Sequence, residues 1–182
     1  MNLSTARKLN GATPCRPDNL QPMKAPLILM ASLALLVGTT CLAADHAPAN
    51  LVRNPGFEEG GAGWVLPKTF SLAGDVAHSG SHSLRIVNTN AASYLLAGQT
   101  VPFEHGMRYR YGAWIKTRGV KGEESGATLC LEWSGAKGWI GGSYADGKKG
   151  DQDWFHVEGV TGPIPTNATS MNIELYLRKG MT

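Results

Sequence analysis

Aromatic and carboxylate side chains recur on the polar faces of β-patterned segments of this sequence. In residues 171–178, for example, apolar residues alternate with Asn172, Glu174, Tyr176 and Arg178, which would share one face of a strand. An aromatic ring can stack on the apolar C–H face of a pyranose, and planar polar groups can bond its hydroxyls in pairs. Sugar recognition is the chemistry that suits the outward residues Tyr94, Trp114, Glu132, Glu174, Tyr176 and Arg178.

Two further aromatic residues, Trp139 and Tyr144, lie in a Gly- and charge-rich stretch at residues 135–153, which is predicted to be a long loop. Long loops in compact domains are often functional, so we interpret this pair as a clamp over a ligand. Alternatives stay open for some outward residues. Trp114 could instead pack under a loop, and Glu174 and Tyr176 could belong to an ordinary amphipathic strand.

The sequence shows no catalytic constellation. The stretch Gly-Gly-Ser-Tyr-Ala at residues 141–145 lacks the last glycine of a nucleophile elbow, Gly-x-Ser-x-Gly. Cys130 has no nearby base in the sequence and is interpreted as an inert thiol. A glycoside hydrolase would need a pair of carboxylates in a cleft, which the sequence pattern does not identify. The chain is therefore predicted not to be an enzyme and to need no catalytic cofactor.

Period-two alternation predicts the fold. Residues 107–117 place Tyr109, Tyr111, Ala113 and Ile115 on one face, and residues 127–133 place Leu129, Leu131 and Trp133 inward. Turn residues separate these runs, and no segment after residue 44 has a helical apolar stripe. The pattern indicates an all-β chain, an antiparallel sandwich or barrel, with Trp64 and Trp133 in its core.

The first 44 residues are predicted to be a leader. Lys24, the apolar run at residues 27–38 and the small residues that end at Ala43 and Ala44 form a signal peptide at residues 23–44. Residues 1–22 are an upstream extension or a long n-region, residues 45–49 a tether, and residues 50–182 the β-sandwich. The protein is expected to be secreted or periplasmic, with no membrane association after cleavage.

Removal of the leader makes the chain electrically neutral. Four of the 17 Lys and Arg residues and one of the 14 Asp and Glu residues precede Ala44, so 13 of each sign remain. No basic stripe is left to neutralise phosphates, and a nucleic-acid partner is not expected. A neutral polysaccharide or oligosaccharide suits this charge better, with the chain acting as a monomeric module.

Four motifs resemble the carbohydrate-binding modules of families four, nine and twenty-two. Residues 50–60, followed by Trp64, are similar to the opening strand of these modules, and residues 78–85 (His-Ser-Gly-Ser-His-Ser-Leu-Arg) to their second signature. Residues 109–117 resemble their central strand, and Asp153-Trp154 their late tryptophan. The resemblance covers residues 50–180 and implies a galactose-binding-like jelly roll that targets a polysaccharide-degrading enzyme to its glycan, with Tyr94 as a binding aromatic. The alternative is a β-sandwich for adhesion or spacing that has no sugar affinity.

The same resemblance implies a structural Ca²⁺, held by Glu58, the Ser81 carbonyl and an aspartate of the last strand. That strand would follow the turn at residues 177–180, and it would pair beside the opening strand. We therefore expect the sandwich to lack its last strand, to leave an unpaired edge near residues 51–57 and to hold an incomplete calcium site.

Overall fold

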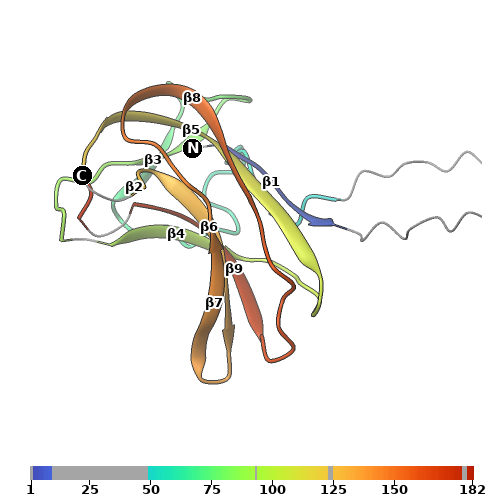
Figure 1. Cartoon of the computed structure of the whole chain (residues 1–182). Coiled ribbons are helices and arrows are strands. Elements are labelled where there is room, and N and C mark those ends of the chain that lie inside the picture. The colour runs from blue at the N-terminus through green and yellow to red at the C-terminus, as the bar shows by residue number, and fades with distance from the viewer. Residues whose placement is uncertain (1, 10–48, 93, 123–124, 178–179) are drawn as a thin grey trace, which may run out of the picture. The chain divides into compact units, whose positions relative to one another are not determined.

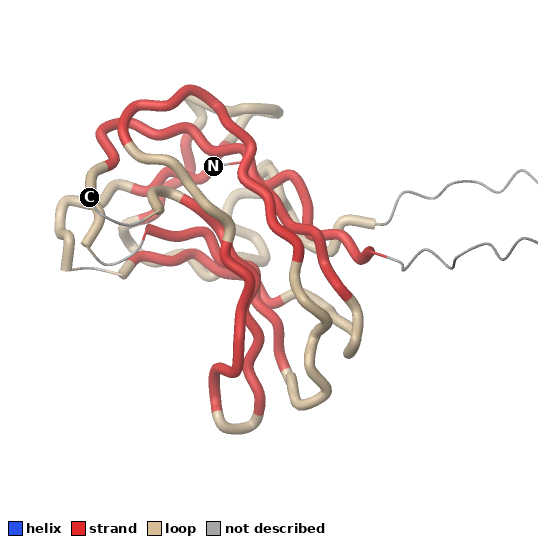
Figure 2. The backbone as a smooth tube through the Cα atoms, in the orientation of Figure 1, coloured by secondary structure: helices blue, strands red, loops and turns tan. Residues whose placement is uncertain are grey.

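Alternating apolar residues fold this chain into strands that each bury one face. The computed structural model describes residues 2–9, 49–92, 94–122, 125–177 and 180–182, which contain strands but no helix. Every strand pair in this part of the chain is antiparallel. The predicted antiparallel β-sandwich is confirmed (Figures 1 and 2).

The strands form two larger sheets and one small one. The first sheet has the order β1-β5-β8, the second β4-β9-β6-β7, and the small sheet is β2-β3. Their bounds are β1 Asn2–Leu9, β2 Phe70–Ala73, β3 Ser83–Ile86, β4 Leu95–Thr100, β5 Arg108–Val120, β6 Thr128–Gly135, β7 Gly138–Tyr144, β8 Gly150–Val160 and β9 Ser170–Leu177.

The core lies between the two larger sheets and follows the predicted alternation. On β5, Tyr109, Tyr111, Ala113 and Ile115 are buried, and they belong to one apolar cluster with residues of the second sheet. That sheet contributes Leu129, Leu131, Trp133, Met171, Ile173 and Leu175. Inward positions are thus apolar on both sheets, which leaves their outer faces for polar residues.

A hydrogen bond between tyrosine and serine ties the two sheets together. The Tyr111 hydroxyl on β5 lies 2.9 Å from Ser143 Oγ on β7, and Ser143 Oγ also donates to the Val160 carbonyl on β8 at 3.4 Å. Gly159 lies opposite Tyr111 in the β5–β8 pair, where a Cβ would collide with the Tyr111 ring. Burial raises the pKa of Tyr111 to about 12, so the hydroxyl stays neutral.

The opening motif is not a strand, contrary to the sequence prediction. Residues 50–64 form turns, and Asn54, Phe57, Gly60 and Gly63 have positive φ values. The Asn54 amide donates to the Gly60 carbonyl at 2.8 Å, and its oxygen accepts from Glu59 N at 3.1 Å. These local bonds replace a strand ladder, so the unpaired strand edge expected near residues 51–57 does not exist there. Val52 and Phe57 are still buried in the core.

The stretch at residues 135–153 is not one long loop. It contains all of β7 and the start of β8, and the β6–β7 hairpin projects from the sandwich in Figure 1. Gly141 and Gly142 carry no apolar side chain, so the alternation of apolar residues did not predict β7. The close approach of other side chains demands these glycines: a Cβ on Gly141 would lie 2.8 Å from Trp133 Nε1, and one on Gly142 would lie 2.8 Å from the Tyr144 hydroxyl oxygen.

The predicted leader falls largely outside the described residues, and its cleavage stays a prediction. Its upstream part includes β1, which pairs antiparallel with β5 from Asn2 opposite Trp114 to Leu9 opposite Arg108. Among the described residues there is no helix long and apolar enough to span a membrane.

Two tryptophans on the same hairpin should differ sharply in their effect on stability. Trp133 is 9% exposed and belongs to the core, whereas Trp139 is 61% exposed. We expect Trp133→Ala to lower the free energy of unfolding by about 3–5 kcal/mol, because it leaves a cavity, and Trp139→Ala to change it little. Urea denaturation of both variants checks this. Equal destabilisation would contradict the assignment of Trp133 to the core.

Candidate functional site

The outer face of the β4-β9-β6-β7 sheet gathers most of the predicted site residues. The strand register aligns Gly98, Glu174, Cys130 and Tyr144 across the four strands, one residue from each. The neighbouring row contains Thr100, Asn172, Glu132 and Gly142. Below, these two rows with Tyr94, Tyr176 and Trp139 are called the outer face.

Two carboxylates lie side by side on the outer face. Glu132, Glu174 and Cys130 each offer an atom within 4.8 Å of the other two. The Tyr144 hydroxyl donates to Glu132 Oε1 at 2.6 Å, and Cys130 Sγ lies 3.9 Å from Glu174 Oε2. Sequence reasoning did not find this carboxylate pair, because the two residues are 42 positions apart and only the β6–β9 register joins them.

The electrostatics of this pair follow from burial. Glu174 is only 9% exposed, and burial, followed by the charge of Glu132, raises the pKa of the Glu174 carboxyl. Burial and the bond to Glu132 also raise the pKa of Tyr144, so Tyr144 remains a hydrogen-bond donor. The outer face thus offers carboxylate acceptors of different exposure beside a neutral phenol.

Exposed aromatic rings flank the carboxylates. Tyr94 is 51% exposed, Tyr144 43% and Trp139 61%. Tyr94 precedes β4 at one edge of the sheet, and Trp139 and Tyr144 lie on β7 at the other. Between them, Gly98 has no side chain beside Glu174, and a Cβ there would already contact Glu174 Cγ at 3.7 Å. Gly98 therefore adds no side-chain atoms beside Glu174, which is nonetheless only 9% exposed.

Tyr176 is not the exposed stacking ring that the sequence predicted. It belongs to the outer face by register but is only 1% exposed. Its ring lies 6.1 Å from that of Tyr94, at an angle of 52° between the ring planes. Replacing it would remove buried area, so Tyr176 contributes to the packing of the sheet next to Tyr94.

Trp114 lies on a different sheet from the other site residues. It is on β5, where its ring stacks on His78 with centroids 4.1 Å apart and planes 9° apart, and His156 lies 5.1 Å away. Trp154 meets the edge of the same His78 ring. The structure thus gives Trp114 the packing role that the sequence left open. Arg178 lies outside the described residues.

Polar residues that the sequence did not single out complete the outer face. Thr100 Oγ1 donates to Asn172 Oδ1 at 2.8 Å, which fixes the orientation of that amide opposite Glu132 in the register. The period-two spacing to Glu174 had already placed Asn172 on the outward face, although not among the ligand-binding residues. Thr100 and Gly98 could not be found in this way, because only the β4–β9 pairing brings them here.

Glu58 and the turn at residues 78–83 come together, as the resemblance implied, but through other atoms. Glu58 Oε1 accepts from Ser81 N at 2.9 Å and His82 N at 3.1 Å, and Oε2 lies 3.1 Å from His82 Nδ1. These bonds, led by the one to His82, lower the pKa of Glu58. Ca²⁺ takes six to eight oxygens, and Glu58 belongs to no group of three or more acidic, His or Cys side chains among the described residues. Calcium binding stays a prediction.

Comparisons with known proteins give structural likeness only. Neither the protein-family models nor the curated proteins yield a match. Among solved structures, the enzymatically active domain of bacteriophage CBA120 tailspike protein 4 is similar, with 16% identity and a TM-score of 0.52 over 72% of this chain. The chain spans only 20% of that protein, and the likeness concerns the fold alone.

Two carbohydrate-binding modules are also similar in structure. A CBM61 module solved with β-1,4-galactotriose has 19% identity and a TM-score of 0.44, over 73% of this chain and 91% of the module. A xylan-binding domain of CBM22 has 19% identity and a TM-score of 0.48, over 69% of this chain and 84% of that domain.

The Glu58 contacts predict a pH-dependent contribution to stability. Because the folded-state pKa of Glu58 is lowered, its contribution is present above the ordinary glutamate pKa, about 4.3, and is lost as the pH falls through the folded-state value. Glu58→Gln should therefore have a lower melting temperature than the wild type at pH 7, and this difference in melting temperature should disappear in acid. The neighbouring exposed residue provides the control, Glu59→Gln. A difference in melting temperature that did not change with pH would contradict the stabilising role of the Glu58 carboxylate charge.

Proposed function

We propose that this chain is a non-catalytic carbohydrate-binding module of the family four, nine and twenty-two type. The observation that carries the proposal is the outer face, where the exposed rings of Tyr94 and Trp139 flank Glu132, Glu174 and the Tyr144 hydroxyl. A pyranose chain presents alternating apolar faces and hydroxyls, which such rings and carboxylates bind in a complementary way. Gly98 adds no side chain to the face beside Glu174, and at Gly142 the Tyr144 hydroxyl fills the space that a side chain would take.

The ligand in this proposal is a neutral β-linked glycan. The chain after residue 44 has equal numbers of acidic and basic residues, and the outer face carries carboxylates rather than a cluster of described cations. An acidic polymer would be repelled by Glu132 and by ionised Glu174. Binding should therefore change little between low and moderate ionic strength.

In this proposal the domain targets an exported polysaccharide-degrading enzyme to its substrate. Tethering by a weak binding module raises the local concentration of glycan for a linked catalytic unit. A β-sandwich for adhesion or spacing would bind no glycan, which distinguishes that alternative directly.

We expect Tyr94→Ala and Trp139→Ala each to weaken glycan binding about 10–100-fold. By analogy with base stacking on aromatic side chains, the loss of one stack costs roughly 1–3 kcal/mol. Isothermal titration with xylan oligosaccharides and β-1,4-galactotriose, preceded by a glycan array, measures the effect. The matched control is another exposed apolar residue away from this face, changed by Val87→Ala. Normal binding by both aromatic variants would contradict the proposed site.

The carboxylate pair supplies a test of the hydrolase alternative. Retaining glycosidases hold their two carboxyl groups about 5–5.5 Å apart, and Glu132 and Glu174 are close neighbours. We expect Glu132→Gln to weaken binding while neither the wild type nor the variant releases reducing sugar. The wild type could instead release reducing sugar, and Glu132→Gln and Glu174→Gln could abolish that release. This result would contradict the binding-module proposal and identify the chain as an enzyme.

In this proposal the leader is removed when the protein is exported. We expect N-terminal sequencing of the exported protein to begin at Ala44 or Asp45, because Ala43 and Ala44 end the signal pattern. An exported protein that began at Met1 or Met23 would contradict cleavage.

A further inference from the structure

Glu132 and Glu174 are a pair of like charges on the outer face. An oxygen of each carboxylate lies within 4.8 Å of an oxygen of the other and of Cys130 Sγ. The described members of the outer face, as defined above, include no Lys, Arg or His. Two ionised carboxylates at this distance repel each other, and the repulsion is stronger where water is excluded. Such a pair releases its two protons in separate steps and passes through a state that holds one proton.

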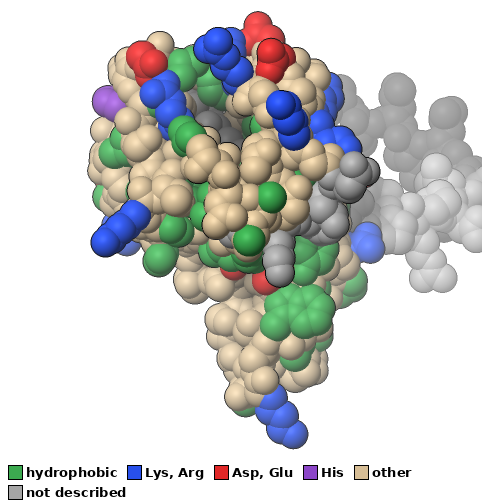
Figure 3. All heavy atoms as spheres, turned by 90° about the vertical axis from the view of Figure 1, so that its left-hand side faces the viewer, with side chains coloured by type: hydrophobic (Ala, Val, Ile, Leu, Met, Phe, Trp, Pro, Cys, Tyr) green, Lys and Arg blue, Asp and Glu red, His purple; other side chains and the backbone are tan. Residues whose placement is uncertain are grey.

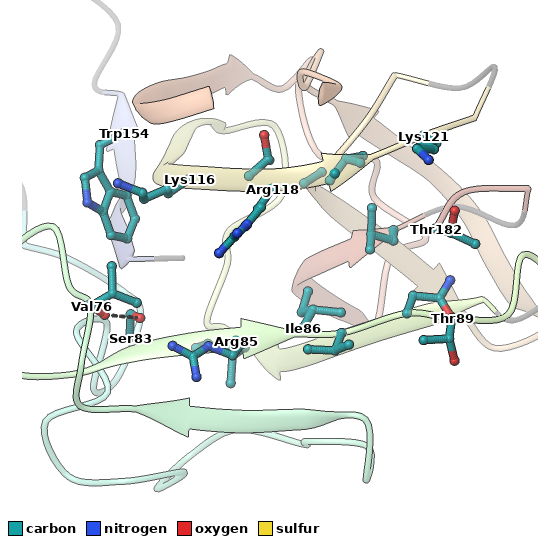
Figure 4. A pocket seen from close by; sticks show the side chains of 18 residues that line it. Val76, Ser83, Arg85, Ile86, Thr89, Lys116, Arg118, Lys121, Trp154 and Thr182 are labelled. Atoms are coloured by element: carbon teal, nitrogen blue, oxygen red, sulfur yellow. Dashed lines mark hydrogen bonds between the residues drawn. The ribbon is translucent and has the colours of Figure 1, made fainter. Parts of the chain in front are cut away.

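Lys and Arg side chains gather at a different place in the molecule. Figure 3 shows several of them around a hollow. The basic residues that line the hollow between β3 and the end of β5 (Figure 4) are Arg85, Lys116, Arg118 and Lys121. Arg85 already pairs with Asp75, and Lys116 pairs with Asp153 at 2.8 Å. None of these four cations belongs to the outer face, so they do not form part of the carboxylate pair.

The surroundings of the two carboxylates differ, and they place the shared proton on Glu174. Glu132 is half-buried, and its Oε1 accepts a hydrogen bond from the Tyr144 hydroxyl at 2.6 Å, as an ionised carboxylate does. Glu174 is 9% exposed, and the thiol near it is a weak donor, with Cys130 Sγ 3.9 Å from Oε2. Burial, followed by the charge of Glu132, raises the pKa of Glu174, which agrees with this placement.

The other titratable groups that face Glu174 are phenols. Tyr144 comes from β7, Tyr94 from the segment before β4, and Tyr176 from β9 itself. Burial raises the pKa of Tyr94 to about 12, and burial also raises the pKa of Tyr144. Both phenols therefore keep their protons at neutral and acidic pH. β4 places Gly98 opposite Glu174 and so contributes no charge there.

A glycan of the proposed kind would exclude more water from this pair. Its hydroxyls can donate to the half-buried Glu132, whereas Glu174 has little surface left to accept from them. The ionised form of Glu174 would then lose solvation without an equal gain in hydrogen bonds, and its repulsion by Glu132 would increase. The bound glycan therefore favours the protonated form of Glu174.

We propose that the Glu132–Glu174 pair binds the glycan while it holds one proton, which Glu174 carries as a hydrogen-bond donor beside the Glu132 acceptor. This inference rests on the proposed function and adds the regulation of its site: a neutral glycan binds with uptake of a proton, and more tightly in mild acid than at alkaline pH. A donor beside an acceptor suits neighbouring sugar hydroxyls, because each hydroxyl can both donate and accept.

The first test uses the full chain without glycan. Because the folded-state pKa of Glu174 is raised, its stabilising contribution is complete below the ordinary glutamate pKa, about 4.3, and is lost as the pH rises through the folded-state value. Glu174→Gln keeps a neutral donor at this position. We expect this variant to have a melting temperature several degrees above that of the wild type at pH 8, and this difference should shrink as the pH falls to 5.

Two further variants separate the charge pair from burial alone. In a Glu132→Gln background, Glu174→Gln should raise the melting temperature at pH 8 by less, because the neighbouring charge is already absent. Glu59→Gln removes one exposed carboxylate away from the outer face and should show no such dependence on pH. A Glu174→Gln variant whose melting temperature at pH 8 was no higher than that of the wild type would overturn the proposal.

The second test measures proton uptake on binding. Isothermal titration of the wild type with xylan oligosaccharides or β-1,4-galactotriose, in two buffers of different ionisation enthalpy, gives the number of protons taken up. We expect uptake of up to one proton and an affinity up to about tenfold higher at pH 5 than at pH 8. Glu174→Gln should bind without proton uptake and with an affinity that does not change over this range.

The outcomes distinguish this inference from the proposed function. Glycan binding by the wild type without proton uptake, or with proton release, would overturn the shared proton and leave the binding module intact. Loss of binding by Glu174→Gln at both pH values would also overturn it, because the ionised carboxylate would then be the ligand-binding form. Absence of glycan binding at either pH would contradict the proposed function itself and overturn this inference with it.

Discussion

Burial of one face of β5 is the constraint on which the rest of the sandwich depends. Tyr109, Tyr111, Ala113 and Ile115 on that strand are at most 1% exposed, and a one-residue slip would turn all four to solvent. Packing of the core therefore fixes which face of β5 points inward. The bond between Tyr111 and Ser143 carries this constraint to β7, the edge strand of the opposite sheet. The position of β7 in turn places Tyr144 over Glu132.

The outer face results from this arrangement rather than from a dedicated loop. Each inward residue on β6 and β9 has outward neighbours, so packing the core also lines up Glu132, Glu174 and Asn172. Glycines shape the surface because they carry no side chain. Gly98 adds no side chain beside Glu174, and Gly141 and Gly142 let Trp133 and Tyr144 pack against the β7 backbone. A rigid sheet with rings at its two edges is a suitable surface for a semi-rigid polymer, because little ordering entropy is lost on binding.

The sequence by itself determined the fold class and the core, because period-two burial is a local property of each strand. Tyr109, Tyr111, Ala113 and Ile115 face inward as their spacing predicted, and so do Leu129, Leu131 and Trp133. It misjudged residues 50–64 and 135–153, where side-chain bonds of Asn54 and packing on glycines override the apolar pattern. Only the tertiary structure decided that Trp114 lies on a separate sheet, that Tyr176 is covered, and that Glu132 meets Glu174. Those facts depend on the pairing register between strands far apart in the chain, which no local spacing encodes.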